Sequence, residues 1–100
     1  MGKIHEGVIN AVKARKGFQE GSAAVIVTNN VVRMSYRGNE IYRDFGYGHK
    51  QFTLAGWNTQ TTRRYLNAVG VDVTSVKGQA VAYGCPIDKN EWYDVYDDVK

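Results

Sequence analysis

The sequence lacks several features that would assign it to common classes of protein. Its single cysteine, Cys85, cannot close an internal disulfide, so the chain is not a disulfide-stabilised scaffold, and we expect Cys85 to act as a small hydrophobic residue. No apolar run is long enough for a transmembrane helix, and residues 1–6 lack the apolar core of a signal peptide. We therefore expect a cytoplasmic protein that does not enter a membrane.

Residues that commonly carry catalysis or bind metal are also scarce. The two histidines, His5 and His49, are far apart in the sequence, and they do not combine with Cys85 at the spacing of zinc ligands. The sequence contains no Ser-His-Asp spacing, no Cys–His combination and no Gly-rich phosphate-binding consensus. We therefore expect no metal, no cofactor and no enzymatic activity.

What the sequence does contain is typical of one small globular domain. The 100 residues are 43% hydrophobic, and they include seven tyrosines, more aromatic character than a disordered chain carries. The net charge of +3 is uneven: residues 1–50 hold eight Lys or Arg against four Asp or Glu, and residues 51–100 hold five against six. Such mild basicity permits contact with nucleic acid without requiring it.

Two helices are predicted from apolar periodicity and capping residues. An apolar stripe with four-residue spacing predicts a helix over 3–16, for which Gly17 offers a stop. A second helix is predicted over 59–69, because Thr59 is a good N-cap and Gly70 a natural terminator.

Short runs rich in β-branched and aromatic residues predict the strands. They are expected at 22–28, 31–37, 40–45, 50–55, 71–76, 79–83 and 91–96. The expected fold is a single α+β domain over residues 1–100, in which an antiparallel β-meander packs against one or two short helices. The hairpin over 71–83 and the strand at 91–96 are expected to complete the same sheet.

The strongest local signal is a hairpin over 31–45. A two-residue loop at Gly38-Asn39 matches the primed turns that fit the twist of paired strands. This loop predicts a charged face with two ion pairs, Arg37 with Glu40 and Arg33 with Asp44. The opposite face is then apolar, through the pairs Tyr36–Ile41 and Val32–Phe45.

These elements carry a family resemblance. Residues 31–83 resemble a group of small uncharacterised phage and prophage proteins. The shared features are the hairpin sequence from Val32 to Ile41, the string Gly56-Trp57-Asn58-Thr59-Gln60-Thr61-Thr62 and the pair Leu66-Asn67; Trp92-Tyr93 is similar to the family's aromatic end. The chain departs from the pattern at Tyr65, where the family usually has arginine, and its basic residues come just before. The resemblance implies a phage origin and a shared fold.

The first candidate binding site surrounds the start of the second helix. A helix N-terminus offers free N–H groups to an anion, hydroxyl and guanidinium groups add donors, and an exposed tryptophan can stack on a base or fill a pocket of a partner. The residues proposed to bind a partner or a phosphate are Trp57, Thr59, Thr61, Thr62, Arg63 and Arg64. The alternative interpretation makes Trp57 a core anchor, Thr59 a cap beside the exposed hydroxyls of Thr61 and Thr62, and the arginines a solvated face.

Two further surfaces are weaker candidates. The charged hairpin face, with Arg33, Arg37, Tyr42 and the nearby Lys50, can track a phosphate backbone or can be a ladder of surface ion pairs. The acidic and aromatic end can meet a basic groove or can be a solvated edge strand; it consists of Asp88, Glu91, Trp92, Tyr93, Asp94, Tyr96, Asp97 and Asp98.

The absence of catalytic groups and the resemblance together favour a binding protein. The expected function is that of a non-enzymatic phage accessory protein that binds and modulates or inhibits a host protein or an anti-phage defence complex. The first alternative is a nucleic-acid-binding accessory protein that uses a basic helix N-terminus, and the second is a component of the virion. The sequence leaves the oligomeric state open.

Overall fold

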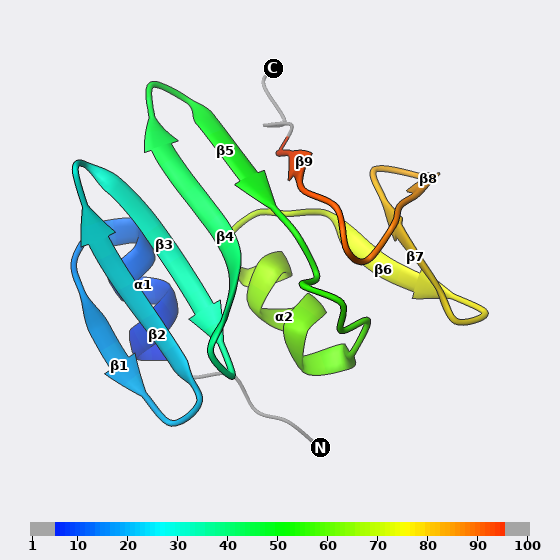
Figure 1. Cartoon of the computed structure of the whole chain (residues 1–100), viewed down its shortest axis with the longest axis horizontal. Helices are drawn as coiled ribbons and strands as arrows, with labels where there is room; N and C mark the ends of the chain where they lie inside the picture. The colour runs from blue at the N-terminus through cyan, green and yellow to red at the C-terminus, as the bar shows by residue number, and fades with distance from the viewer. Residues whose placement is uncertain (1–5, 96–100) are drawn as a thin grey trace.

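The computed structural model describes residues 6–95, and in this range the chain forms two helices and two antiparallel sheets (Figure 1). The helices are α1 (Glu6–Ala14) and α2 (Gln60–Ala68). The strands are β1 (Phe18–Glu20), β2 (Ala23–Thr28), β3 (Val31–Tyr36), β4 (Asn39–Gly46), β5 (His49–Phe52), β6 (Val73–Val76), β7 (Gln79–Ala82), β8 (Cys85–Pro86) and β9 (Tyr93–Asp94). The expected α+β meander is confirmed.

The strands divide into a larger and a smaller sheet. Six strands form the order β1-β2-β3-β4-β5-β9, and the remaining three form β6-β7-β8. The expectation that the hairpin over 71–83 joins the main sheet is therefore wrong. Its strands are β6 and β7, and β7 pairs with β8 instead of with a strand of the six-stranded sheet. The last strand does join the main sheet, but β9 is only two residues long and pairs with β5. Strand β1 was not expected, because its three residues are all exposed and carry no apolar alternation.

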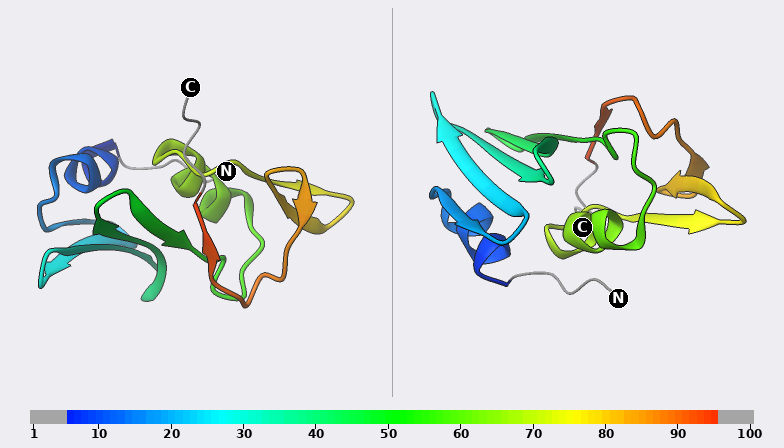
Figure 2. Two further views of the ribbon diagram at one scale, coloured as in Figure 1. Left: turned by 90° about the horizontal axis from the view of Figure 1, so that it is seen from above. Right: turned by 60° about the horizontal axis from the view of Figure 1, so that its bottom comes forward.

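Both helices cover one face of the six-stranded sheet (Figure 2). The amphipathic α1 buries Val8, Ile9, Ala11 and Val12, and α2 buries Tyr65 and Leu66 against the same cluster. The inward side chains of the strands complete this core; they include Val25, Val32, Met34, Ile41, Tyr42 and Phe52. The other face of the sheet has no helix of the described chain upon it, so that its polar side chains meet solvent, as an antiparallel sheet with one wet side allows.

The ends of the helices follow from local sequence signals. The first helix is shorter than the predicted 3–16, and residues 3–5 lie outside the described range. It stops at Arg15, not Gly17: Arg15 has φ 57°, and the Lys16 N–H donates to the Ala11 carbonyl at 3.0 Å. The second helix has its predicted cap, Thr59. Its predicted terminator is confirmed at Gly70, where the backbone reaches φ 101°.

The hairpin register differs from the prediction. The turn is Arg37-Gly38, with φ 53° and 81°, so that Tyr36 pairs with Asn39 and Ser35 with Glu40. A register shift between Met34 and Ser35 then leaves Ile41 without an opposite residue. Because of this bulge, the consecutive side chains of Ile41 and Tyr42 are both buried in the core. In a regular strand, neighbouring side chains would point to opposite faces of the sheet.

The same turn type recurs along the chain. In each case a left-handed non-glycine residue precedes a left-handed glycine, as type I′ turns require. The pairs are Arg37-Gly38, Tyr47-Gly48, Ala55-Gly56, Lys77-Gly78 and Tyr83-Gly84. The prediction placed Lys77-Gly78 correctly and shifted the first hairpin by one residue, because it put Gly38 first in the turn instead of second.

Candidate functional site

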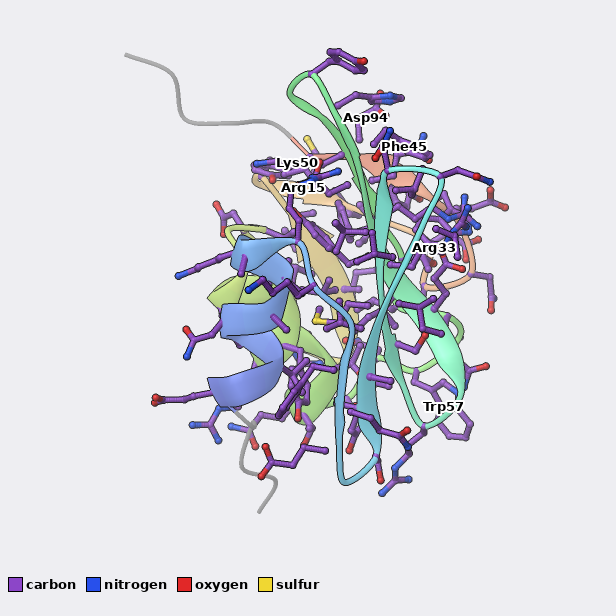
Figure 3. The ribbon with its side chains drawn as sticks, turned by 90° about the vertical axis from the view of Figure 1, so that its left-hand side faces the viewer. Arg15, Arg33, Phe45, Lys50, Trp57 and Asp94 are labelled. Carbon is purple, nitrogen blue, oxygen red and sulfur yellow. The ribbon has the colours of Figure 1, made fainter. Side chains whose placement is uncertain are left out.

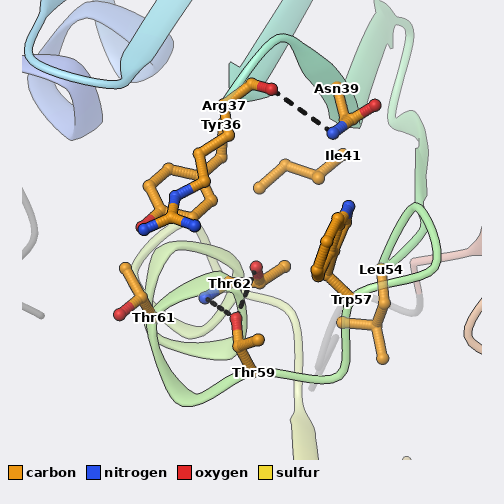
Figure 4. Close-up of a pocket in the computed structure, with 9 residues that line it drawn as sticks. All are labelled: Tyr36, Arg37, Asn39, Ile41, Leu54, Trp57, Thr59, Thr61 and Thr62. Atoms are coloured by element: carbon orange, nitrogen blue, oxygen red, sulfur yellow. Dashed lines mark hydrogen bonds between the residues drawn. The ribbon is translucent and has the colours of Figure 1, made fainter.

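A small pocket lies between the tip of the β3–β4 hairpin and the start of α2 (Figure 4). Its volume is about 110 Å³. The hairpin and the loop before α2 supply apolar walls, and the first turn of α2 supplies hydroxyl groups. The lining residues are Tyr36, Arg37, Asn39, Ile41, Leu54, Trp57, Thr59, Thr61 and Thr62.

The threonines at this helix start are used mainly in folding. The Thr62 N–H donates to the Thr59 side-chain oxygen at 3.3 Å, and the two hydroxyl oxygens lie 3.0 Å apart. This bond satisfies one of the backbone donors that every helix start leaves open. Thr62 is 1% exposed, so the alternative in which it lies exposed beside the cap is wrong. Thr61 is half-buried and lines the pocket.

Trp57 projects from the surface because of the turn that precedes it. Ala55 and Gly56 both have positive φ, and the Trp57 N–H closes the turn on the Leu54 carbonyl at 2.8 Å. Gly56 has φ 85°, a conformation that favours glycine, and a Cβ at this position would also lie only 3.0 Å from the Asn90 side-chain oxygen. The indole that follows is 56% exposed. Trp57 is therefore not a core anchor.

Arg37 joins this pocket from the hairpin side. It occupies the hairpin turn, and its backbone N–H donates to the Ser22 carbonyl at 2.7 Å. Its guanidinium lies 5.6 Å from the centre of the Tyr36 ring, which in turn packs on Tyr65 of α2 with ring centres 5.4 Å apart. Figure 4 shows the guanidinium and the Trp57 indole on two sides of the same opening. The sequence prediction had assigned Arg37 to a different surface.

The two arginines of α2 do not line the pocket. Arg63 is half-buried, and it donates from Nη1 to the Asn58 side-chain oxygen at 2.5 Å, on the side of the β6–β7 hairpin. Arg64 is exposed. The six residues predicted to form one site are therefore divided: four line the pocket with Arg37, and Arg63 faces a separate polar hollow.

The predicted charged hairpin face is not assembled as expected. On the outer face, Glu40 pairs with Arg33 at 3.3 Å and with Arg43 at 2.5 Å, so the predicted pairs Arg37–Glu40 and Arg33–Asp44 are wrong. Arg43 also stacks on the Trp92 ring at 3.8 Å from its centre. Both errors follow from the shifted turn and the bulge.

The other members of that predicted set lie elsewhere. Tyr42 is buried in the core with 2% exposure. Lys50 pairs in register with Asp44, which makes an ion pair with Arg15 at the end of α1. Figure 3 shows Arg15 and Lys50 on the helix side of the sheet and Arg33 on the opposite side. A phosphate backbone therefore cannot follow these residues along one face.

The acidic end is mostly engaged in local contacts. Asp94 lies 3.6 Å from His49 and accepts from Gln51 at 3.3 Å, which ties β9 to β5. Asp88 accepts the Asn90 backbone N–H at 2.8 Å. Glu91 is exposed. The other predicted members, Tyr96, Asp97 and Asp98, lie outside the described residues.

Within residues 6–95, no helix is long and apolar enough to span a membrane. The same range contains no cluster of three or more His, Cys, Asp or Glu side chains suited to a metal ion. Cys85 is exposed, not buried as a hydrophobic residue would be.

Five of the nine residues that line the pocket were not predicted to belong to this site. Tyr36, Arg37, Asn39 and Ile41 come from the hairpin tip, and Leu54 comes from the end of the meander. The repeated pattern of a residue followed by a left-handed glycine is a signal that places Arg37 at the turn. No local pattern predicts that this turn packs beside Thr59.

Comparison with known proteins identifies a family. The family model described as Kyanoviridae Gp96 protein matches residues 1–95 of the chain. No curated protein and no solved structure matches it.

Proposed function

This chain belongs to the Kyanoviridae Gp96 protein family, a family of phage proteins, and from that premise we propose that it is a non-enzymatic accessory protein that binds a host protein through the pocket beside Trp57. Binding would modulate or inhibit this host protein or an anti-phage defence complex. The observation that carries the proposal is a tryptophan that is 56% exposed next to a small, mainly apolar opening.

The size of the pocket favours a side chain over a substrate. Its volume is about 110 Å³. Small-molecule sites usually measure about 300–1,000 Å³, and a cavity of about 150 Å³ can hold one benzene ring. An opening of this size accepts one apolar side chain of a partner. The indole of Trp57 would then pack against the partner residues beside that side chain, which is the arrangement of a binding hot spot.

The charge at the rim favours a particular partner sequence. Arg37 is the charged residue among the side chains that line the pocket, and no carboxylate lines it. A carboxylate beside the inserted apolar side chain would meet the guanidinium, which offers two parallel N–H donors to such a group. We therefore expect the partner to present an apolar residue next to Asp or Glu.

The proposal is tested by affinity capture from host cells with nuclease-treated lysate. The wild-type chain should retain a stoichiometric protein, and Trp57→Ala should lose it. Tyr47→Ala is the matched control, because Tyr47 is an exposed aromatic residue in the β4–β5 turn, away from the pocket. Capture that both variants retain, or that nuclease abolishes, contradicts the proposal.

A nucleic-acid-binding function is the second candidate, favoured by one observation. Arg37, Arg63 and Arg64 all lie around the first turns of α2, although they face different ways. Binding of this kind would weaken linearly on a log–log scale as salt increases, and it would be lost in the variant Arg63→Ala, Arg64→Ala. Unchanged DNA and RNA binding in that double variant excludes this site.

A further inference from the structure

A second, polar hollow lies beside Asn58, between the start of α2, the β6–β7 turn and the loop over 87–90. Its volume is about 550 Å³, within the range of small-molecule sites. Side-chain amides, a hydroxyl and charged groups dominate its wall. The lining residues are Asn58, Arg63, Ser75, Gly78, Gln79, Ala80, Ile87, Asp88, Lys89 and Asn90.

The Arg63 guanidinium in this wall is held in place before any ligand arrives. Its Nη1 donates to the Asn58 side-chain oxygen at 2.5 Å. Asn58 is fixed in turn, because its amide nitrogen donates to the Ser75 hydroxyl at 3.4 Å and to the Gly78 carbonyl at 3.3 Å. Guanidinium carries five N–H donors in a planar fork, so the bond to Asn58 leaves donors that can serve a ligand.

The opposite wall is fixed by hydrogen bonds of the backbone and of the Gln79 side chain. The Ile87 N–H donates to the Ala80 carbonyl at 2.9 Å, and Gln79 donates from its side chain to the Ile87 carbonyl at 2.8 Å. The Lys89 carbonyl accepts the Gly56 N–H at 2.8 Å. The loop that carries the Lys89 ammonium is therefore tied both to β7 and to the turn before Trp57.

The charge of the hollow is positive. Arg63 and Lys89 line it together with a single acidic residue, Asp88, whose Oδ1 already accepts the Asn90 N–H at 2.8 Å. Two cationic residues in one lining favour a dianion over a monoanion, because each can contribute Coulomb attraction and charge-assisted hydrogen bonds. The lining contains no aromatic ring on which a base could stack.

We propose that this hollow binds a phosphate group, with the Arg63 fork and the Lys89 ammonium as its charged ligands. The group can come from a small phosphate ester or from a nucleic-acid backbone, and both present the same oxygens. This site is independent of the protein-binding pocket at Trp57, since none of the charged groups of the hollow lines that pocket.

The test is a titration of the full chain followed by NMR of its backbone amides, with three probes: inorganic phosphate, a nucleoside monophosphate and a short single-stranded oligonucleotide. We expect saturable shifts at Gly78, Lys89 and Asn90. Arg63→Gln and Lys89→Gln should each weaken binding about tenfold, the usual effect of losing one charge-assisted contact. The tightest probe identifies the source of the phosphate.

Matched controls separate a site from general attraction to a basic protein. Lys13→Gln and Lys16→Gln each remove a positive charge from an exposed position outside the hollow, and they should leave binding within about twofold. Trp57→Ala should also bind phosphate normally, so failure of the protein-binding proposal does not affect this one. The absence of saturable shifts, or equal weakening by the controls, overturns the phosphate site.

Discussion

The two tryptophans of this chain have opposite surroundings. Trp92 lies on the outer face of the large sheet, half-buried, with the Arg43 guanidinium 3.8 Å above its ring and Glu40 holding that guanidinium. Trp57 is 56% exposed beside an open pocket, and Arg37 across the opening has no carboxylate next to it in the pocket wall. The same residue types therefore form a closed structural cluster in one place and an available surface in the other.

What separates the two regions is the position of one carboxylate. Glu40 lies opposite Ser35 and makes ion pairs with both Arg33 and Arg43, so both arginines of the outer face have an anionic partner. No acidic side chain takes this role in the pocket beside Trp57. A pattern of tryptophan and arginine in a sequence is thus insufficient to predict a binding surface, because the pairing of the charges decides which cluster is open.

The largest effect on partner binding should come from removing the exposed indole of Trp57. Trp57→Ala should weaken binding of the captured partner by at least about 2 kcal/mol, or roughly 30-fold, because exposed aromatic anchors dominate interface energies. The free energy of unfolding should change by less than about 0.5 kcal/mol, as is usual for an exposed side chain. Calorimetric titration and urea denaturation measure the two quantities. A large loss of stability with unchanged affinity would make Trp57 a structural residue.

Replacing Trp92, whose ring is covered by Arg43, should lower stability and leave partner binding unchanged. Trp92→Ala removes a cation–π contact of about 0.5–1 kcal/mol and the burial of its ring, so we expect a loss of about 1–2 kcal/mol in the free energy of unfolding. Partner binding should persist. Urea denaturation with a binding assay of the folded variant checks both, and lost affinity in a folded Trp92→Ala protein would erase the distinction between the two regions.

The contrast also depends on α2, which positions the wall of the pocket. Thr59→Ala removes the N-cap bond to Thr62 and should cost about 1 kcal/mol of stability. Thr61→Ala is the control on the same turn, because Thr61 lines the pocket without capping the helix. Thermal unfolding of the two variants should separate them, and equal melting temperatures would mean that the cap is unimportant.

The smallest effect concerns the carboxylate that closes the outer face. Glu40→Gln leaves Arg33 and Arg43, which are opposite each other in register, without their shared anion. We expect a loss of about 0.5–1 kcal/mol at low salt that shrinks as salt screens the repulsion. Urea curves at two salt concentrations test this, with the exposed Glu91→Gln as control. A loss independent of salt would point to packing rather than charge.

Local signals in the sequence predicted the elements that depend on neighbouring residues. Thr59 and Gly70 mark the ends of α2, and Lys77-Gly78 marks the turn between β6 and β7, because capping and turn chemistry act over a few residues. The hairpin register failed for a local reason as well: the bulge at Ile41 adds one residue that no alternating pattern reveals.

The candidate site was predicted only in part, because it is assembled from distant segments. Trp57, Thr59, Thr61 and Thr62 are near one another in sequence, and they stay together in the pocket. Arg37 reaches them from the hairpin through tertiary packing. Arg63 turns away because of Asn58, whose own partners lie on the β6–β7 hairpin. Contacts of this range follow from the fold and not from periodicity.

The accessibility of the two indoles tests the central comparison most directly. In Trp92→Phe the fluorescence comes from Trp57 alone, and in Trp57→Phe it comes from Trp92 alone, since the chain has two tryptophans. Acrylamide should quench Trp57 clearly more strongly than Trp92. Equal quenching, or stronger quenching of Trp92, would contradict the assignment of the open surface to the start of α2.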